Sequence, residues 1–267
     1  MMLKKIAASI RQHDWFAVGI EILVVMIGLM LAFQLDRWRE GIAERRQEQV
    51  YISRLINDVQ TDIPAIEYAI DLQTLRLELV NLLIAVARDP AIASEQPTVF
   101  LGAVNQAAFT YTPTLTSHTF ENLRSTGDLR LVRDESVKSV MFDYYGFDEE
   151  ERQFRPLQLA TEARHFELAA GVLSNEQEVF MQDAWLFFRP HNFDAAKSAK
   201  TDDAGVAEAA MRLQGRPQLV AWLPYVRSLQ LDQLEAHNSR LGRAHKALEA
   251  LSNYAREIQA PAAGVSN

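Results

Sequence analysis

The sequence predicts an all-α protein, in which an N-terminal transmembrane helix is continuous with a long stalk helix and leads into a helical-bundle domain. One apolar run is long enough to cross a bilayer, and apolar residues beyond it recur every three to four positions. The alternation that is typical of strands is nearly absent. Aliphatic and aromatic residues make up 48% of the 267 residues, which is sufficient for a core outside the membrane.

The membrane anchor is predicted over residues 15–35. At about 1.5 Å per residue this run covers the roughly 30 Å hydrocarbon layer, and Trp15 and Trp38 flank it as interfacial aromatic side chains. The run is longer than the apolar part of a signal peptide, and no small-residue cleavage site follows it. We therefore expect an uncleaved, single-pass anchor whose partner is the lipid bilayer.

The flanking charges bear on orientation. Basic residues in the short N-terminus, 1–14, nearly balance those that follow the run. Because short basic N-termini usually stay in the cytoplasm, we expect the C-terminal domain on the extracytoplasmic side.

One face of the anchor is a predicted helix-pairing surface. In helical register, this face carries Ala17, Glu21, Val25, Gly28 and Ala32. Small residues allow a second helix to approach closely, and a carboxyl group among them can hydrogen-bond across the interface. This pattern predicts a homo-oligomer or pairing with another membrane protein. The alternative is that Glu21 lies close enough to the end of the run to reach the lipid headgroups.

Residues 36–64 are predicted to continue the anchor as a stalk helix. Pro64 is expected to kink or restart the helix, with Asp62 available as a cap. The bundle domain is then expected over 65–258. The apolar residues with helical spacing on the stalk and just beyond it are Ile52, Leu55, Val59, Ile63, Ile66 and Ile70.

Start and stop signals divide the bundle into further helices. The predicted caps and first residues are Thr98, Asp134, Ser174 with Gln177 as a capping box, and Pro217. The helices are expected over 65–88, 98–109, 118–125, 135–172 with a bend at Pro156, 175–188, 204–213 and 217–258. Residues 110–117 are expected to be an extended loop, and 259–267 a disordered tail.

Composition and motifs exclude most function classes. The absence of cysteine excludes disulfides, thiolate metal sites and a thiol nucleophile, and a net charge of −8 disfavours nucleic acid. No nucleophile elbow, phosphate-binding loop or zinc-hydrolase helix occurs. His118 and Glu121 lie one turn apart, but a solvated pair is the expected state. We therefore predict no catalytic residues, no metal and no cofactor.

A short turn is the best candidate for a ligand or partner site outside the membrane. Exposed amides at Ser125, Thr126, Gly127 and Asp128 are available to a ligand, although a glycine-capped helix end explains the same residues. The acidic run 148–151 either attracts a cation or forms a solvated surface, and the second is expected.

An aromatic patch is the last candidate. It consists of Trp185, Phe187, Phe188 and Phe193, interleaved with Arg189. Such a patch either lines a pocket or partner surface, or packs in the core where helices meet. Core packing is expected.

Two segments resemble the signatures of an uncharacterised family of bacterial single-span membrane proteins. VGIEILVVMIGLMLAFQLDRWRE matches a Gly-Glu-Ile, central Gly and Ala-x-Gln-x-x-x-Trp pattern, except that Ile20 separates the Gly from the Glu. ENLRSTGDLRLVRDESVKSVMFDYY matches a Ser-x-Gly-x-Leu turn followed by a helix with paired tyrosines. The resemblance implies an anchored helical domain in the bacterial inner membrane and brings no known activity.

Two functions follow as hypotheses. The first is noncatalytic scaffolding or protein–protein interaction at the membrane. The alternative is an extracytoplasmic ligand-sensing bundle that signals through a membrane partner.

Overall fold

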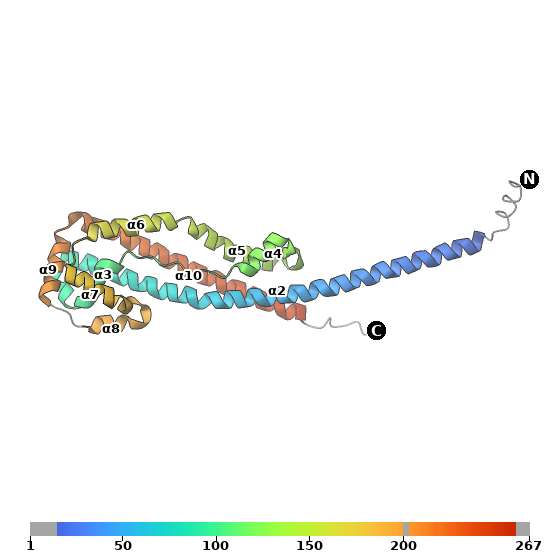
Figure 1. The fold of residues 1–267 in the computed structure, drawn as a ribbon, viewed down its shortest axis with the longest axis horizontal. Helices are drawn as coiled ribbons and strands as arrows, with labels where there is room; N and C mark the ends of the chain where they lie inside the picture. Colours follow the sequence, from blue (N-terminus) through green and yellow to red (C-terminus); the bar gives the residue numbers. More distant parts are fainter. Residues whose placement is uncertain (1–14, 200–202, 260–267) are drawn as a thin grey trace, which may run out of the picture.

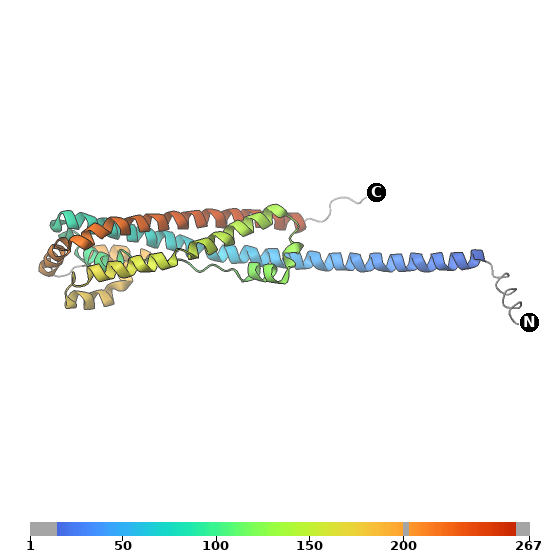
Figure 2. The same ribbon diagram turned by 90° about the horizontal axis from the view of Figure 1, so that it is seen from above.

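The computed structural model describes residues 15–199 and 203–259, and within them it contains α-helices and short 3-10 helices but no strand. Figures 1 and 2 show an elongated helical bundle from which one helix projects as a rod. The predicted all-α class is confirmed. The predicted N-terminus 1–14 lies outside the described residues, as does the predicted tail 259–267 apart from Gln259, which ends the last helix.

The rod belongs to helix α2, which runs without a break from Trp15 to Arg88. At about 1.5 Å per residue it is about 110 Å long. Its residues 19–40 are exposed, and burial begins at Glu48. Anchor and stalk are therefore one continuous helix, as predicted, but the expected stalk 36–64 already packs in the bundle from Glu48 onward.

Helix α2 does not restart at Pro64, contrary to the expectation from sequence. A proline in a helix leaves the carbonyl of residue i−4 without its N–H partner. Pro64 and Gln60 both lie on the exposed side, where water can reach that carbonyl, while Val59 and Ile66 stay buried on either side of the proline. Packing of these flanking residues holds the helix together. Asp62 is not a cap, because α2 continues through it.

The second long helix, α10 (Pro217–Gln259), packs along α2 through the length of the bundle (Figures 1 and 2). Pro217 begins it as predicted. The remaining α-helices are α3 (Pro97–Gln106), α4 (His118–Thr126), α5 (Glu135–Arg152), α6 (Arg155–Ala169), α7 (Asn175–Ala184), α8 (Phe193–Ser198) and α9 (Asp203–Gln214). The 3-10 helices are η1 (Pro90–Ser94), η2 (Asp128–Leu131), η3 (Trp185–Phe188) and η4 (Pro190–Asn192).

Two of the predicted caps are present. The Asp134 carboxylate accepts the N–H of Ser136 at 2.7 Å and of Val137 at 3.3 Å, and Ser174 and Gln177 form the predicted capping box. Gly127 ends α4 in the left-handed conformation with φ +77°, which glycine adopts without strain.

Two local predictions are wrong. Thr98 is not a cap, because α3 begins at Pro97 and the buried Thr98 hydroxyl donates to the carbonyl of Ala199 at 3.0 Å. The helix expected over 135–172 is two helices, since α5 ends at Arg152 and α6 begins at Arg155 with Pro156 in its first turn. A proline is tolerated there because the first N–H groups of a helix have no partner within it.

The core consists of two apolar clusters along the α2–α10 pair. The cluster nearer the rod joins the first half of the packed part of α2 to α4, α5 and the end of α10. Its most buried members include Ile52, Leu55, Leu123, Met141 and Tyr144. The distal cluster joins the end of α2 to α3, α7, α8, α9 and the start of α10; its most buried members include Leu79, Leu83, Phe100, Phe188 and Leu223. A layer of buried polar side chains lies between them.

Candidate functional site

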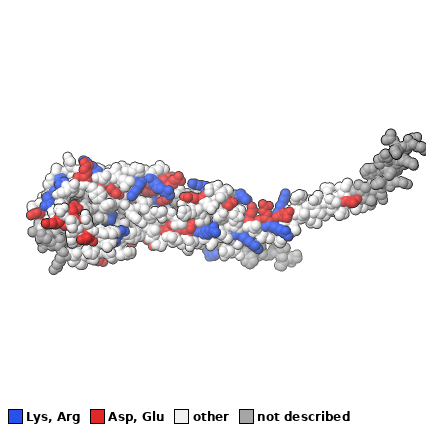
Figure 3. All heavy atoms as spheres, viewed as in Figure 1, with Lys and Arg blue, Asp and Glu red and all other residues white. Residues whose placement is uncertain are grey.

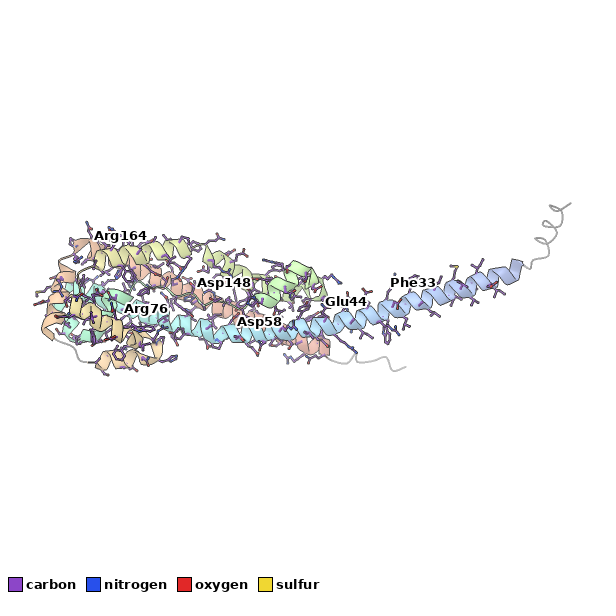
Figure 4. The ribbon with its side chains drawn as sticks, viewed as in Figure 1. Phe33, Glu44, Asp58, Arg76, Asp148 and Arg164 are labelled. Atoms are coloured by element: carbon purple, nitrogen blue, oxygen red, sulfur yellow. The ribbon has the colours of Figure 1, made fainter. Side chains whose placement is uncertain are left out.

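The predicted turn at residues 125–128 docks against α2 where this helix leaves the bundle. The Asp128 carboxylate accepts the Tyr51 hydroxyl at 3.1 Å and the Gln47 amide at 3.4 Å. Arg130 forms an ion pair with Glu44 at 2.7 Å, and Figure 4 places Glu44 at the point where the rod begins. We call this set of contacts the α2 junction.

A buried carboxylate completes the α2 junction. Glu48 is 3% exposed and accepts hydrogen bonds from the Tyr254 hydroxyl on α10 and from the backbone N–H of Arg133. Burial raises the pKa of Tyr254 to about 12, so its hydroxyl remains a donor at neutral pH. Gln49 also donates to the carbonyl of Ile258 at 3.0 Å. The junction therefore ties the base of the rod to both the turn and the end of α10.

The other side chains of the turn are engaged locally. The hydroxyls of Ser125 and Thr126 both donate to the carbonyl of Asn122, at 3.1 and 2.8 Å. Both bonds stay within the last turn of α4. The turn's longest-range contact is the one from Asp128 to α2.

The predicted pairing face lies on the projecting rod. The side chains of Glu21, Val25, Gly28 and Ala32 are exposed, and a Cβ added at Gly28 would meet no atom within 4 Å. The side chain of Ala17 lies outside the described residues. Figure 3 shows the rod as mostly uncharged, with acidic and basic side chains gathered where it meets the bundle.

The polar layer contacts the backbone of the segment between α3 and α4, residues 107–117, which is partly buried. Buried backbone groups need hydrogen-bond partners, and side chains of α2, α6 and α10 supply them. Asp62 accepts the N–H of Thr116 at 2.8 Å and the hydroxyl of Tyr144 at 2.9 Å, and its burial raises its pKa. The other pairs are Gln230 to the Ala107 carbonyl, Glu162 to the Thr110 N–H, and His237 to the Tyr111 carbonyl.

His237 also belongs to a buried charged network. Its Nδ1 accepts from the Arg240 guanidinium at 2.9 Å, so the proton on a neutral ring lies on Nε2, which donates to Tyr111. Burial and then the charge of Arg240 lower the pKa of His237 to about 4. Arg240 is 1% exposed and pairs with Asp148, which also accepts Arg152 at 2.6 Å.

Asp148 corrects the expectation that residues 148–151 form a solvated acidic surface. Glu149 and Glu150 are exposed, but Asp148 is 5% exposed and bound to two arginines. The sequence reasoning also missed the network's partners on α10. The missed signal is that Gln230, Gln233, His237 and Arg240 continue the three–four spacing of Val226 toward Ala244.

A cleft with both charged and apolar side chains in its walls opens beside this network. Two adjoining hollows of about 240 and 510 Å³ share Leu115, Ser117, Glu121, Asp148 and Arg152 in their walls. The larger one also reaches His118 and Arg155. Glu121 accepts the Ser117 hydroxyl at 2.5 Å, and within the described ranges no group of three or more His, Asp or Glu side chains is placed to hold a metal ion.

The predicted aromatic patch divides between core and surface. Phe188 and Phe193 are buried in the distal cluster and Phe187 packs against it, as core packing predicts. Trp185 is 46% exposed and stacks under the Arg189 guanidinium, whose carbon lies 4.8 Å from the ring centroid.

Together these features define a class: an all-α bundle built around a helix with one segment long and apolar enough to cross a membrane. A family of unknown function, DUF6090, matches residues 21–151, which run from the exposed apolar segment to the end of α5. This is just under half of the chain. It includes the turn and most of both segments on which the sequence resemblance rests, but not α10. No curated protein and no solved structure matches the chain.

Proposed function

We propose that this protein is a noncatalytic interaction protein of the bacterial inner membrane, in which a single span holds a helical bundle at the surface to bind other proteins. One observation supports it above all. The helix that carries the apolar segment is also a central helix of the bundle, so anchor and domain form one rigid unit.

The apolar segment is suited to lipid and not to water. Its large side chains are about half exposed or more, from 46% at Ile20 to 65% at Phe33. A contiguous apolar surface of this size marks a membrane or protein contact.

The pairing face supplies the contact within the membrane. Among the described residues no atom fills the space beside Gly28, and Ala32 lies one turn away on the same face. Glu21 adds a carboxyl group that a partner helix can hydrogen-bond. A homo-oligomer or another membrane protein fits this surface, and the continuous α2 would fix the orientation of the bundles to one another.

Crosslinking and affinity capture from membranes test this proposal. Gly28→Leu and Glu21→Leu are expected to lose the oligomer or partner that the wild type retains. Phe33→Leu is the matched control, because residue 33 lies about 120° around the helix from residue 21. An unchanged oligomer size and partner set in both face variants would refute it.

A topology reporter tests the proposed orientation. The reporter is active only outside the cytoplasm and is fused after Ile258. Because Ile258 lies in the last turn of α10, the fusion reports the side on which the bundle lies. We expect it to be active. An inactive fusion at normal expression would place the bundle in the cytoplasm.

Ligand sensing outside the cytoplasm is the second candidate, and the cleft beside Asp148 and Arg152 favours it. The larger hollow, about 510 Å³, presents Arg152 and Arg155 beside Glu121 and Glu151. Such mixed charge suits a small zwitterion. Under this hypothesis, a small polar compound raises the melting temperature of the wild type and not of Arg155→Gln.

A further inference from the structure

A hollow near the end of the bundle farthest from the rod has arginines as its charged walls. It has a volume of about 440 Å³ and lies between the end of α2 and the early part of α10. Its walls are Asn81, Ile84, Ala85, Arg88, Pro224 and Arg227. Figure 1 shows these parts of α2 and α10 at the opposite end of the molecule from the projecting helix. We call this hollow the arginine groove.

Neither arginine of the groove has an acidic partner in the described part of the chain. There, the side chain of Arg88 forms no ion pair or hydrogen bond, and Arg227 donates only from Nε to the side-chain oxygen of Asn81, at 2.8 Å. A guanidinium carries five N–H donors. The terminal nitrogens of Arg227 and the whole guanidinium of Arg88 are therefore available to a bound anion, and no acidic side chain lines the groove.

A structural role explains one of these arginines but not both. Arg88 lies in the last turn of α2, where the helix dipole favours a cation. Arg227 lies in the interior of α10, so the dipole does not account for it. The protein as a whole carries a net charge of −8, and the cleft beside Asp148 and Arg152 has carboxylates in its walls. The arginine groove is thus a basic site on an acidic protein.

We propose that the arginine groove binds an acidic segment of a partner protein, in which an apolar side chain separates two carboxylates. A guanidinium suits a carboxylate because it presents its N–H groups in a planar fork. Asn81, which holds Arg227, and Arg88 are two turns or about 10 Å apart along α2. Ile84 and Ala85 lie between them and give the groove an apolar wall. One carboxylate for each arginine and an apolar side chain between them match this order.

Charge complementarity is the reason for choosing an acidic occupant. A protein with a net charge of −8 repels acidic segments in general, so contact with one requires a local basic site. The inference rests on the proposed function, because the bundle must bind other proteins for the groove to have such a partner. It does not rest on the pairing face, which lies on the rod at the other end of the molecule.

Fluorescence anisotropy with labelled peptides tests the proposal. The full-length protein, in a mild uncharged detergent at low ionic strength, is titrated into a short peptide that contains Glu-Leu-Glu and into the same peptide with Gln-Leu-Gln. We expect only the acidic peptide to bind, and added salt to weaken its binding. Its affinity is expected to fall about fivefold or more in Arg88→Gln and in Arg227→Gln.

Arg54→Gln is the matched control. Arg54 is an exposed arginine of α2 outside the groove, and its side chain has no ion pair among the described residues. The control therefore changes the net charge of the protein by the same amount as the groove variants do, and it should bind the acidic peptide as the wild type does. Because Arg88 and Arg227 are also exposed, we expect both groove variants to keep the melting temperature of the wild type.

Three results in the titrations would overturn the proposal: no binding of the acidic peptide to the wild type, equal binding of both peptides, or an affinity that both groove variants leave unchanged. An equal loss in Arg54→Gln would also overturn it, since it would show a general effect of charge. Displacement of the peptide by an equal concentration of inorganic phosphate would assign the groove to a small anion instead. Capture of partners from membranes is a separate measurement, so failure of this inference is distinguishable from failure of the proposed function.

Discussion

Acidification is expected to destabilise the bundle through His237. Its pKa is about 4 in the folded protein against an ordinary value of 6.5, so the unfolded chain binds the proton first. The stabilising contribution is therefore complete above about pH 6.5 and is lost as the pH falls toward 4. A shift of this size corresponds to roughly 3 kcal/mol in the limit, of which about 2 kcal/mol is lost between pH 7 and pH 5.

The physical cause is first the burial of the ring and then the guanidinium of Arg240 beside it. Nδ1 must stay unprotonated to accept from Arg240, and a second positive charge beside that guanidinium is repelled. His165 also has a lowered pKa because it is buried, so the wild type alone does not isolate the effect of His237.

Urea unfolding of the full-length protein in mild detergent, followed by circular dichroism at pH 7 and pH 5, measures the effect. His237→Gln is expected to lose about 2 kcal/mol less than the wild type over this interval, because a glutamine does not titrate. His245→Gln, at an exposed position of the same helix, is the control and should follow the wild type. Equal pH dependence in wild type and His237→Gln would refute the reasoning.

Three further substitutions test the packing of the bundle by the same unfolding assay. Gly102→Ala would place a Cβ 1.7 Å from the ring of Phe188 and should cost about 1–3 kcal/mol; unchanged stability would mean that the ring moves freely. Asp134→Ala removes the cap of α5 and should cost about 1 kcal/mol, and a neutral result would assign no role to that cap. Leu55→Ala, at a fully buried position, should cost about 2–5 kcal/mol of stability. Val50→Ala on the exposed face should change stability by less than about 0.5 kcal/mol. Similar values for the two variants would contradict the burial of Leu55.

Features that depend on near neighbours in sequence could be predicted. The caps at Asp134 and Ser174 and the helix end at Gly127 follow from contacts within three residues. Pro64 shows the limit of such rules, because whether the helix breaks there depends on the tertiary packing of Val59 and Ile66. Thr98 is a residue type that often caps helices, but its hydroxyl donates to the carbonyl of Ala199, about a hundred positions away.

The candidate sites were harder to foresee. The turn was found from its residues, but its bonds to Tyr51 and Gln47 span 77 and 81 positions. Arg76 carries no local signal, since its neighbours in sequence look like an ordinary helix with a charged exposed face. Only the folded chain shows that this position is buried.

The pairing of α2 with α10 has a consequence for biosynthesis. The packed face of α2 is complete once residue 88 has been made, but α10 begins only at residue 217. At about 5–20 residues per second, the ribosome takes roughly ten seconds or more to supply that partner. During this interval the apolar stripe of α2 is only partly covered. We therefore expect nascent chains of this protein to need chaperones until α10 has been synthesised. A bundle of sequential helical hairpins would need them less, because each helix would pack on the one made just before it.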